Sequence, residues 1–302
     1  MAAVSRWMEP KRRVFEAIIR SLRRRAELRL DWITVDGGDI AFLSNTDRFD
    51  TRPPPVTLIH GLGADKDTWL HMSRYMTDDF SLVIPDLAGH GDNTCDDSLD
   101  LGAKAQALRI LNLLDALDIR RSHIVGSSMG GAVAAHLAEL APEALLSLTL
   151  IDSYGAIARP SYVDELAKNT GLNPMLDIVT RGDYANMMSL TMSDPPFVPG
   201  FLLDVLVEKM AARRSTNKKA YEDSLASADL TSSLENIEAQ ALVIWGAEDK
   251  VLHVDNAVIF QEALRNCSTV VMEKTGHIPM VERPRQTAAL IKRFISSAEA
   301  RV

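Results

Sequence analysis

From residue 30 to the C-terminus, short and almost wholly apolar runs alternate with stretches whose apolar residues recur at helical spacing. This alternation is typical of parallel strands joined by crossover helices, because strands covered on both faces have no polar side. Residues 30–35 and 40–43 flank the turn-prone Asp36-Gly37-Gly38 and predict an opening hairpin. Six further strands are expected at 56–59, 81–84, 123–125, 145–151, 241–245 and 268–272, and helices at 100–117, 131–141, 254–264 and 286–296. The pattern predicts an α/β fold with a mostly parallel, eight-stranded sheet flanked by helices.

Residues 153–233 interrupt this alternation. Their 81 residues far exceed the dozen or so that a crossover connection needs. Prolines precede a helical run at 200–214, so we expect a helical cap inserted after the sixth strand, over a core formed by residues 30–152 and 234–302. Six apolar residues of the cap are interpreted either as the lining of an acyl channel or as its own core: Met187, Met188, Met192, Phe197, Phe201 and Leu202.

Residues 1–29 form a separate, basic segment. The first 30 residues hold nine Lys or Arg against three Glu, although the whole chain has a net charge of −8. Residues 11–25 predict a basic amphipathic helix, which favours either peripheral contact with a membrane or packing on the domain or on a second subunit. The segment lacks the apolar centre of a secretory signal and no stretch is apolar enough to span a membrane, so a cytoplasmic location is expected. The acidic net charge argues against nucleic acid as the main partner.

The strongest chemical signal is Gly126-Ser127-Ser128-Met129-Gly130, which follows a predicted strand directly and precedes a predicted helix. A nucleophile on such a tight turn has a strained backbone, and small residues two before and two after it let strand and helix pass closely. Ser128 has glycine at both of these positions and Ser127 does not. We therefore predict that Ser128 is a nucleophile, with a glycine-rich turn without chemistry as the alternative.

A serine hydroxyl needs a base, and the base needs a carboxylate to fix its tautomer. Among the seven histidines, His277 follows the last predicted strand, where a loop can bring it over Ser128. Asp249 follows the preceding strand and gives the chain order Ser, Asp, His that is expected of this architecture. Asp152, which ends the strand at 145–151, and Glu248 remain alternative acids. Ser128, His277 and Asp249 are thus the predicted catalytic triad.

Acyl transfer also requires hydrogen-bond donors for the oxyanion. The backbone N–H groups of Met129 and of Leu62, in His60-Gly61-Leu62-Gly63, are the predicted donors. The stretch 86–91, which contains Asp86 and His90, is interpreted as a fixed turn at the pocket rim. The two cysteines, Cys95 and Cys267, lack the spacing of a metal site, so no metal is expected.

Together these motifs resemble the α/β-hydrolase superfamily from about Val56 to the C-terminus. Residues 60–69, 126–131, 244–249 and 276–284 are similar to the monoacylglycerol lipase branch and to the bacterial lipases called family V. The resemblance implies the α/β-hydrolase fold, with nucleophile, acid and base at Ser128, Asp249 and His277. It also implies a small-molecule substrate, a monoacylglycerol or another simple acyl ester, and no cofactor.

Two other functions use the same residues. A carbon–carbon bond hydrolase acting on vinylogous ketones has the same triad and oxyanion site, so only contacts from the cap distinguish it. A binding protein that keeps the fold without turnover is the alternative outside the enzymes.

Overall fold

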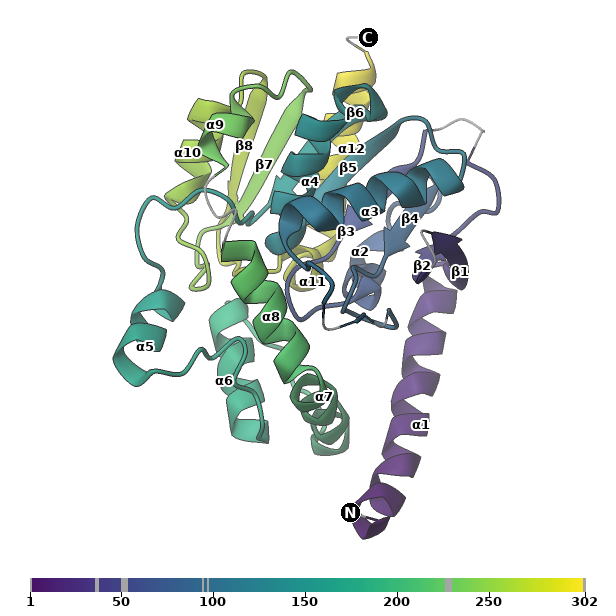
Figure 1. Ribbon diagram of the computed structural model, residues 1–302, viewed down its shortest axis with the longest axis vertical. Helices are drawn as coiled ribbons and strands as arrows, with labels where there is room; N and C mark the ends of the chain where they lie inside the picture. The colour runs from purple at the N-terminus through teal and green to yellow at the C-terminus, as the bar shows by residue number, and fades with distance from the viewer. Residues whose placement is uncertain are drawn as a thin grey trace.

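The computed structural model describes residues 2–35, 38–49, 54–93, 95–96, 98–225 and 230–300. At its centre lies one eight-stranded sheet of order β1-β2-β4-β3-β5-β6-β7-β8 (Figure 1). The strands are β1 (Arg29–Val35), β2 (Gly38–Ser44), β3 (Val56–Ile59), β4 (Leu82–Pro85), β5 (Ser122–Ser127), β6 (Leu145–Ile151), β7 (Ala241–Gly246) and β8 (Cys267–Met272). β2 pairs antiparallel with β1 and β4, and all other neighbours are parallel. The predicted sheet and opening hairpin are confirmed, although Asp36 and Gly37 of the turn lie outside the described residues.

Helices cover both faces of the sheet. One core contains residues of α3 (Ala103–Ala116), α4 (Met129–Leu140) and α10 (Asn256–Ala263), and the other contains residues of α2 (Leu70–Ser73), α11 (Pro279–Glu282) and α12 (Pro284–Glu299). β4 illustrates the division, because Val83 joins the first core while Leu82 and Ile84 join the second. Both faces are therefore apolar, which explains the near-continuous apolar runs in the sequence.

The last strand differs from its prediction. β8 was expected to be buried on both faces, but most of its residues are partly exposed and Val271 is 44% exposed. The reason is its position at the edge of the sheet, where it pairs only with β7. An apolar run alone does not reveal whether a strand lies in the middle or at the edge.

Between β6 and β7 the chain forms α5 (Tyr162–Thr170), α6 (Arg181–Thr191), α7 (Gly200–Ala212), α8 (Arg214–Leu225) and the short α9 (Thr231–Leu234). Local sequence starts two of them, because Ser161 with Asp164 and Thr180 with Asp183 form capping boxes. Helices α5 to α8 project together from one side of the sheet (Figure 1). Helices α5 to α9 form the segment inserted between β6 and β7.

The N-terminal helix α1 (Ala2–Arg25) begins well before residue 11, where apolar periodicity starts. It projects from the same side of the sheet as the inserted segment (Figure 1) and packs against α7. The Lys11 Nζ atom lies 2.6 Å from Asp204 of α7, and Arg23 forms two hydrogen bonds of 2.7 Å to Asp67 of the core. Within the described residues, no helix has the length and apolarity that crossing a bilayer requires.

Candidate active site

Ser128 lies at the turn between β5 and α4, with backbone angles φ 55° and ψ −123°. This conformation is strained for a residue with a side chain, as is typical of an exposed nucleophile. The two flanking glycines permit it. A Cβ atom on Gly126 would lie 2.1 Å from the carbonyl oxygen of Gly130, and one on Gly130 would lie 2.3 Å from that of Ile59. The neighbouring Ser127 belongs to β5, where it pairs with β6.

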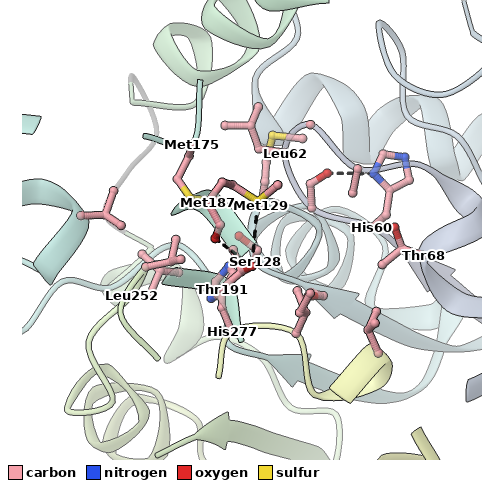
Figure 2. Close-up of a pocket in the computed structure, with 18 of the residues that line it drawn as sticks. His60, Leu62, Thr68, Ser128, Met129, Met175, Met187, Thr191, Leu252 and His277 are labelled. Carbon is pink, nitrogen blue, oxygen red and sulfur yellow. Dashed lines mark hydrogen bonds between the residues drawn. The ribbon is translucent and has the colours of Figure 1, made fainter. Parts of the chain in front are cut away.

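His277 lies in the loop after β8 and is 4% exposed. Its backbone N–H donates to Thr191 of the inserted segment at 2.8 Å, and its Nδ1 atom lies 2.7 Å from Oδ2 of Asp249. When Nδ1 carries the proton of that hydrogen bond, Nε2 is the free acceptor of the neutral ring. Ser128 and His277 line the same cavity, and Figure 2 shows their side chains together within it.

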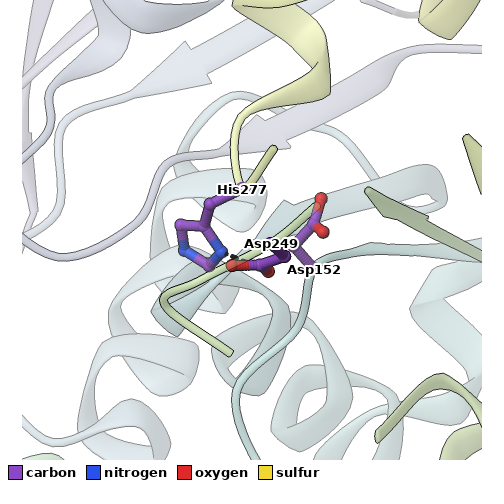
Figure 3. A group of neighbouring side chains, drawn as sticks. All are labelled: Asp152, Asp249 and His277. Atoms are coloured by element: carbon purple, nitrogen blue, oxygen red, sulfur yellow. Dashed lines mark hydrogen bonds and ion pairs between the residues drawn. The ribbon is translucent and has the colours of Figure 1, made fainter. Parts of the chain in front are cut away.

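Asp249 is held by its own loop. Its Oδ1 atom accepts hydrogen bonds from the backbone N–H groups of Val251 at 2.8 Å and Leu252 at 3.0 Å. Of the alternative acids, Glu248 accepts a hydrogen bond from the Ser193 hydroxyl at 2.5 Å instead. Asp152 lies beside the pair (Figure 3), but its Oδ1 atom accepts from the backbone of Gly246 and not from His277. Asp249 is therefore the carboxylate that is hydrogen-bonded to His277.

The two predicted oxyanion donors meet at Ser128. Met129 is the first residue of α4, Leu62 follows β3, and both line the cavity with Ser128 (Figure 2). The loop approaches so closely that a Cβ atom on Gly61 would lie 2.9 Å from that of Ser128. Within the described ranges, neither the Leu62 nor the Met129 amide donates to another residue. Both N–H groups are thus available to a ligand in the cavity.

A buried polar cluster supports the Leu62 loop, and the sequence did not reveal it. The Lys66 Nζ atom donates to Asp86 at 2.5 Å and to Asp92 at 2.6 Å, and the Lys66 backbone N–H donates to Asp86 at 2.8 Å. Burial opposes the charge of Lys66, but the Asp86 carboxylate prevails and raises its pKa. Next to them, burial lowers the pKa of His60 to about 4, and its neutral ring accepts from the Leu87 N–H at 3.0 Å. As expected, the stretch 86–91 is a fixed turn.

Glu282 is a second residue that sequence reasoning did not single out. Its carboxylate accepts hydrogen bonds from the backbone of Gly276 at 2.8 Å, Asp194 at 3.0 Å and Ser193 at 3.2 Å. It therefore ties the loop of His277 to the end of α6. The only sequence signal was its place in Glu282-Arg283-Pro284, which carried the family resemblance.

The cavity has a volume of about 540 Å³, and the core, the inserted segment and α1 all line it. Its walls include Met187, Met188 and Met192, as expected for an acyl channel. The channel interpretation does not hold for Phe197, Phe201 and Leu202, which are not among its lining residues. Phe197, which precedes α7, is 90% exposed, and Phe201 in the first turn of α7 is 41% exposed. The residues of α7 that line the cavity include Leu206 and Met210 instead. Phe15 and Ile19 of α1 complete the wall.

Asp152, Asp249 and His277 each bring one oxygen or nitrogen atom within 4.8 Å of the others. Such a group has the composition of a metal site, but the atoms of Asp249 and His277 that face each other already share a hydrogen bond. Neither of the two cysteines, Cys95 and Cys267, is part of a disulfide.

Comparison with known proteins gives a consistent result. Residues 58–290 match the model of the "Alpha/beta hydrolase family". The chain is 29% identical to Lipase 1 of Psychrobacter immobilis, over 94% of this chain and 90% of that protein. It is 30% identical to the monoacylglycerol lipase abhd6-B of Xenopus laevis, over 82% and 77%. The crystal structure of a membrane phospholipase A, a bacterial virulence factor, superimposes with a TM-score of 0.91 at 33% identity, covering 99% of this chain and 95% of that one.

Proposed function

Because the chain belongs to the α/β hydrolase family, we propose that it cleaves carboxylic esters through an acyl-enzyme on Ser128, with His277 as the base and Asp249 as the acid. The observation that carries this proposal is the 2.7 Å hydrogen bond between Nδ1 of His277 and Asp249, in the cavity that Ser128 also lines. It leaves Nε2 of His277 as the acceptor for the serine proton.

In the first half of the reaction, Oγ of Ser128 attacks the ester carbonyl while Nε2 of His277 takes its proton. The N–H groups of Leu62 and Met129 stabilise the oxyanion of the tetrahedral intermediate. The imidazolium, balanced by Asp249, then protonates the departing alcohol and leaves an acyl group on Ser128. In the second half, His277 deprotonates a water molecule that attacks this acyl group, and the acid product leaves as Ser128 regains its proton.

Replacing Ser128 tests the nucleophile. Ser128→Ala should lower the turnover of p-nitrophenyl butyrate by about a million-fold, to background, and should abolish labelling by a fluorophosphonate probe. Ser127→Ala is the matched control and should keep both. Circular dichroism verifies the fold of each variant. Turnover by Ser128→Ala would refute the proposal, and an unlabelled wild-type chain would indicate a binding protein without turnover.

Replacing the acid tests its assignment. Asp249→Asn should lower kcat by about ten-thousand-fold, because an amide favours the wrong tautomer of His277. Glu248→Gln is the control and should change kcat less than threefold, since its carboxylate contacts Ser193. The reverse order of effects would transfer the role of the acid to Glu248.

The protein is a carboxylic ester hydrolase, and we propose monoacylglycerols and other simple acyl esters as its substrates. The lipase relatives support this class, as does a cavity with three methionines, whose flexible side chains suit an acyl chain. A panel of monoacylglycerols, short esters, triacylglycerols and a vinylogous ring-cleavage ketone, compared by kcat/KM, tests the choice. A preference for the ketone would favour the carbon–carbon bond hydrolase instead.

We further propose that the protein contacts a membrane through α1 and the beginning of α7. Trp7 is 80%, Val14 46% and Ile18 37% exposed, and these three residues share one face of α1. The exposed Phe201 lies at the start of α7, the helix on which α1 packs, and the exposed Phe197 lies just before it. Lys11, Arg12 and Arg23 pair with carboxylates of the domain, and Arg13 and Arg20 with Glu9 and Glu16 of α1 itself. The exposed Arg24 and Arg25 would therefore be the first to meet anionic lipid.

A further inference from the structure

Asp152 is a carboxylate that the proposed mechanism does not use. It follows β6, is fully buried, and lies in the same cluster as Asp249 and His277 (Figure 3). Its φ of 43° is in the left-handed region, so the backbone is strained to place this side chain here. A buried acid in a strained position beside a catalytic pair requires a physical reason.

The hydrogen bonds of the two acids are unequal. Asp249 accepts three, from His277, Val251 and Leu252. Asp152 accepts one, at 2.8 Å from the Gly246 backbone to Oδ1, while its Oδ2 atom is buried without a partner. Two buried carboxylates so close together cannot both be ionised without a large cost. The acid with fewer donors is therefore the better site for a proton, at the oxygen atom that has no hydrogen-bond partner.

The electrostatics agree with this assignment. Burial raises the pKa of Asp152 well above its usual range, the negative charge of Asp249 raises it further, and the Gly246 amide only partly opposes both. Glu282 adds to the increase. These two carboxylates and His277 are the titratable groups that surround Asp152.

We propose that Asp152 is a positioning residue, whose carboxylic acid donates a hydrogen bond from Oδ2 to the Asp249 carboxylate and so fixes the orientation of Asp249 toward His277. This inference rests on the proposed function. Asp152 does not touch the substrate; it acts through Asp249. The backbone N–H of Gly246 in turn holds Asp152. The ends of β6 and β7 are thus joined through the side chain that orients Asp249.

Two substitutions of similar size separate this role from a merely structural one. In Asp152→Asn, the amide can still donate to Asp249 and accept from Gly246, so kcat should stay within about threefold of wild type. In Asp152→Leu the donor is lost, and kcat should decrease by about 10- to 100-fold, the range of a hydrogen bond to a charged group, with KM unchanged. Equal losses in both variants, or no loss in the leucine variant, would overturn the proposal.

The pH profile tests the protonation state. If Asp152 is neutral, Asp152→Asn removes no charge, and the acidic limb of kcat/KM, which reports the free base, should keep its midpoint. A midpoint that moves to lower pH would mean that an anion beside His277 had been removed, and the proposal would be wrong. The infrared difference spectrum between wild type and Asp152→Asn should contain a carboxylic acid C=O band at pH 7. The absence of this band would contradict the proposal. This test does not depend on the folding of the Asp152→Leu variant.

A double-mutant cycle tests whether Asp152 acts through Asp249. In an Asp249→Ala background, Asp152→Leu should cause little further loss, because the group that it positions is gone. Additive losses would contradict this. The proposed function is tested independently of this inference. It would be refuted by turnover in Ser128→Ala, whatever the activities of the Asp152 variants.

Discussion

At Ser128, the proposed nucleophile, the backbone conformation that the proposed chemistry uses should lower the stability of the fold. The φ of 55° at Ser128 suits glycine far better than serine, and such strain costs about 1–3 kcal/mol. Ser128→Gly should therefore be more stable than Ser128→Ala by about 1 kcal/mol or more, measured by urea unfolding, although both are inactive. Ser127→Gly is the control and should destabilise, because it weakens β5. Equal stability of Ser128→Gly and Ser128→Ala would indicate an unstrained turn.

Buried histidines give the protein a predictable acid sensitivity. Burial lowers the pKa of His90 to about 3, from an ordinary value of 6.5. Between these values the unfolded chain binds a proton that the folded chain does not, so stability falls as pH falls. The free energy of unfolding should decrease by about 2 kcal/mol from pH 6.5 to 5 through His90.

His90→Asn isolates this contribution. The amide can replace the 3.0 Å contact of Nδ1 with the Ala88 carbonyl, and it does not titrate. Urea unfolding of wild type and His90→Asn at pH 7, 6 and 5 measures the difference in their free energies of unfolding. The contributions of the other buried titratable groups largely cancel in that difference. The variant should lose less stability toward pH 5 than wild type, and parallel losses would mean that His90 is not kept neutral by the fold.

At the scale of elements, α1 is held by ion pairs of very different strength. Arg23 and Asp67 form a two-pronged pair with side chains only 14% exposed, whereas Arg20 and Glu16 are each 61% exposed. Arg23→Ala should loosen α1 by about 2 kcal/mol or more, because it leaves a mostly buried carboxylate unpaired, while Arg20→Ala should cost less than about 0.5 kcal/mol. Hydrogen exchange of the α1 amides measures both effects.

Loosening α1 should also affect catalysis, because Phe15 and Ile19 line the cavity. Arg23→Ala should raise KM for long-chain esters more than for p-nitrophenyl acetate, with Arg20→Ala as the control. Faster exchange in α1 without any change in KM would mean that this wall does not contact the acyl chain.

Sequence reasoning succeeded where the local pattern and the tertiary structure depend on the same residues. The mostly parallel sheet was predictable because alternating strands and helices allow few arrangements, and the turn at Ser128 because only glycine fits at positions 126 and 130. The edge position of β8 and the supporting roles of Lys66 and Glu282 were not predictable from the sequence. These depend on which segments meet in space, and no local signal encodes that contact.

The same limit explains the errors in the inserted segment and in α1. Helical spacing identified an apolar face on α7, but not which of its residues face the cavity, so the channel interpretation does not hold for Phe201 and Leu202, nor for Phe197 before the helix. The basic stretch 11–25 left two interpretations open, contact with a membrane or packing on the domain. The structure has features that bear on each of them. One side of α1 packs on the domain, while the adjacent side exposes apolar side chains.

For the whole molecule, α1 joins a wall of the cavity to a candidate lipid surface. One side of α1 contributes Phe15 and Ile19 to the cavity wall, and the adjacent side, the outer face, carries Trp7, Val14 and Ile18. A bilayer bound to the outer face would therefore lie next to the helix that forms part of the cavity wall. This arrangement predicts that lipid binding and the hydrolysis of membrane-borne substrate depend on the same residues.

Point substitutions on the outer face test this surface without removing the cavity wall. The combined variant Trp7→Ser, Val14→Ser and Ile18→Ser should reduce co-sedimentation with phosphatidylglycerol vesicles by about tenfold or more, since each side chain loses apolar area that lipid would bury. The matched control is Val258→Ser, which alters a residue of α10 that is 54% exposed away from α1.

Hydrolysis of p-nitrophenyl butyrate in solution should be unchanged in the combined variant, whereas hydrolysis of monoacylglycerol in vesicles should decrease with binding. Because arginines contribute, wild-type binding should also weaken in phosphatidylcholine vesicles and at high salt. Equal partitioning of the combined variant and wild type would exclude α1 as the lipid contact. If the rate of monoacylglycerol hydrolysis in vesicles were also unchanged, the enzyme would not take its substrate from the bilayer at this face.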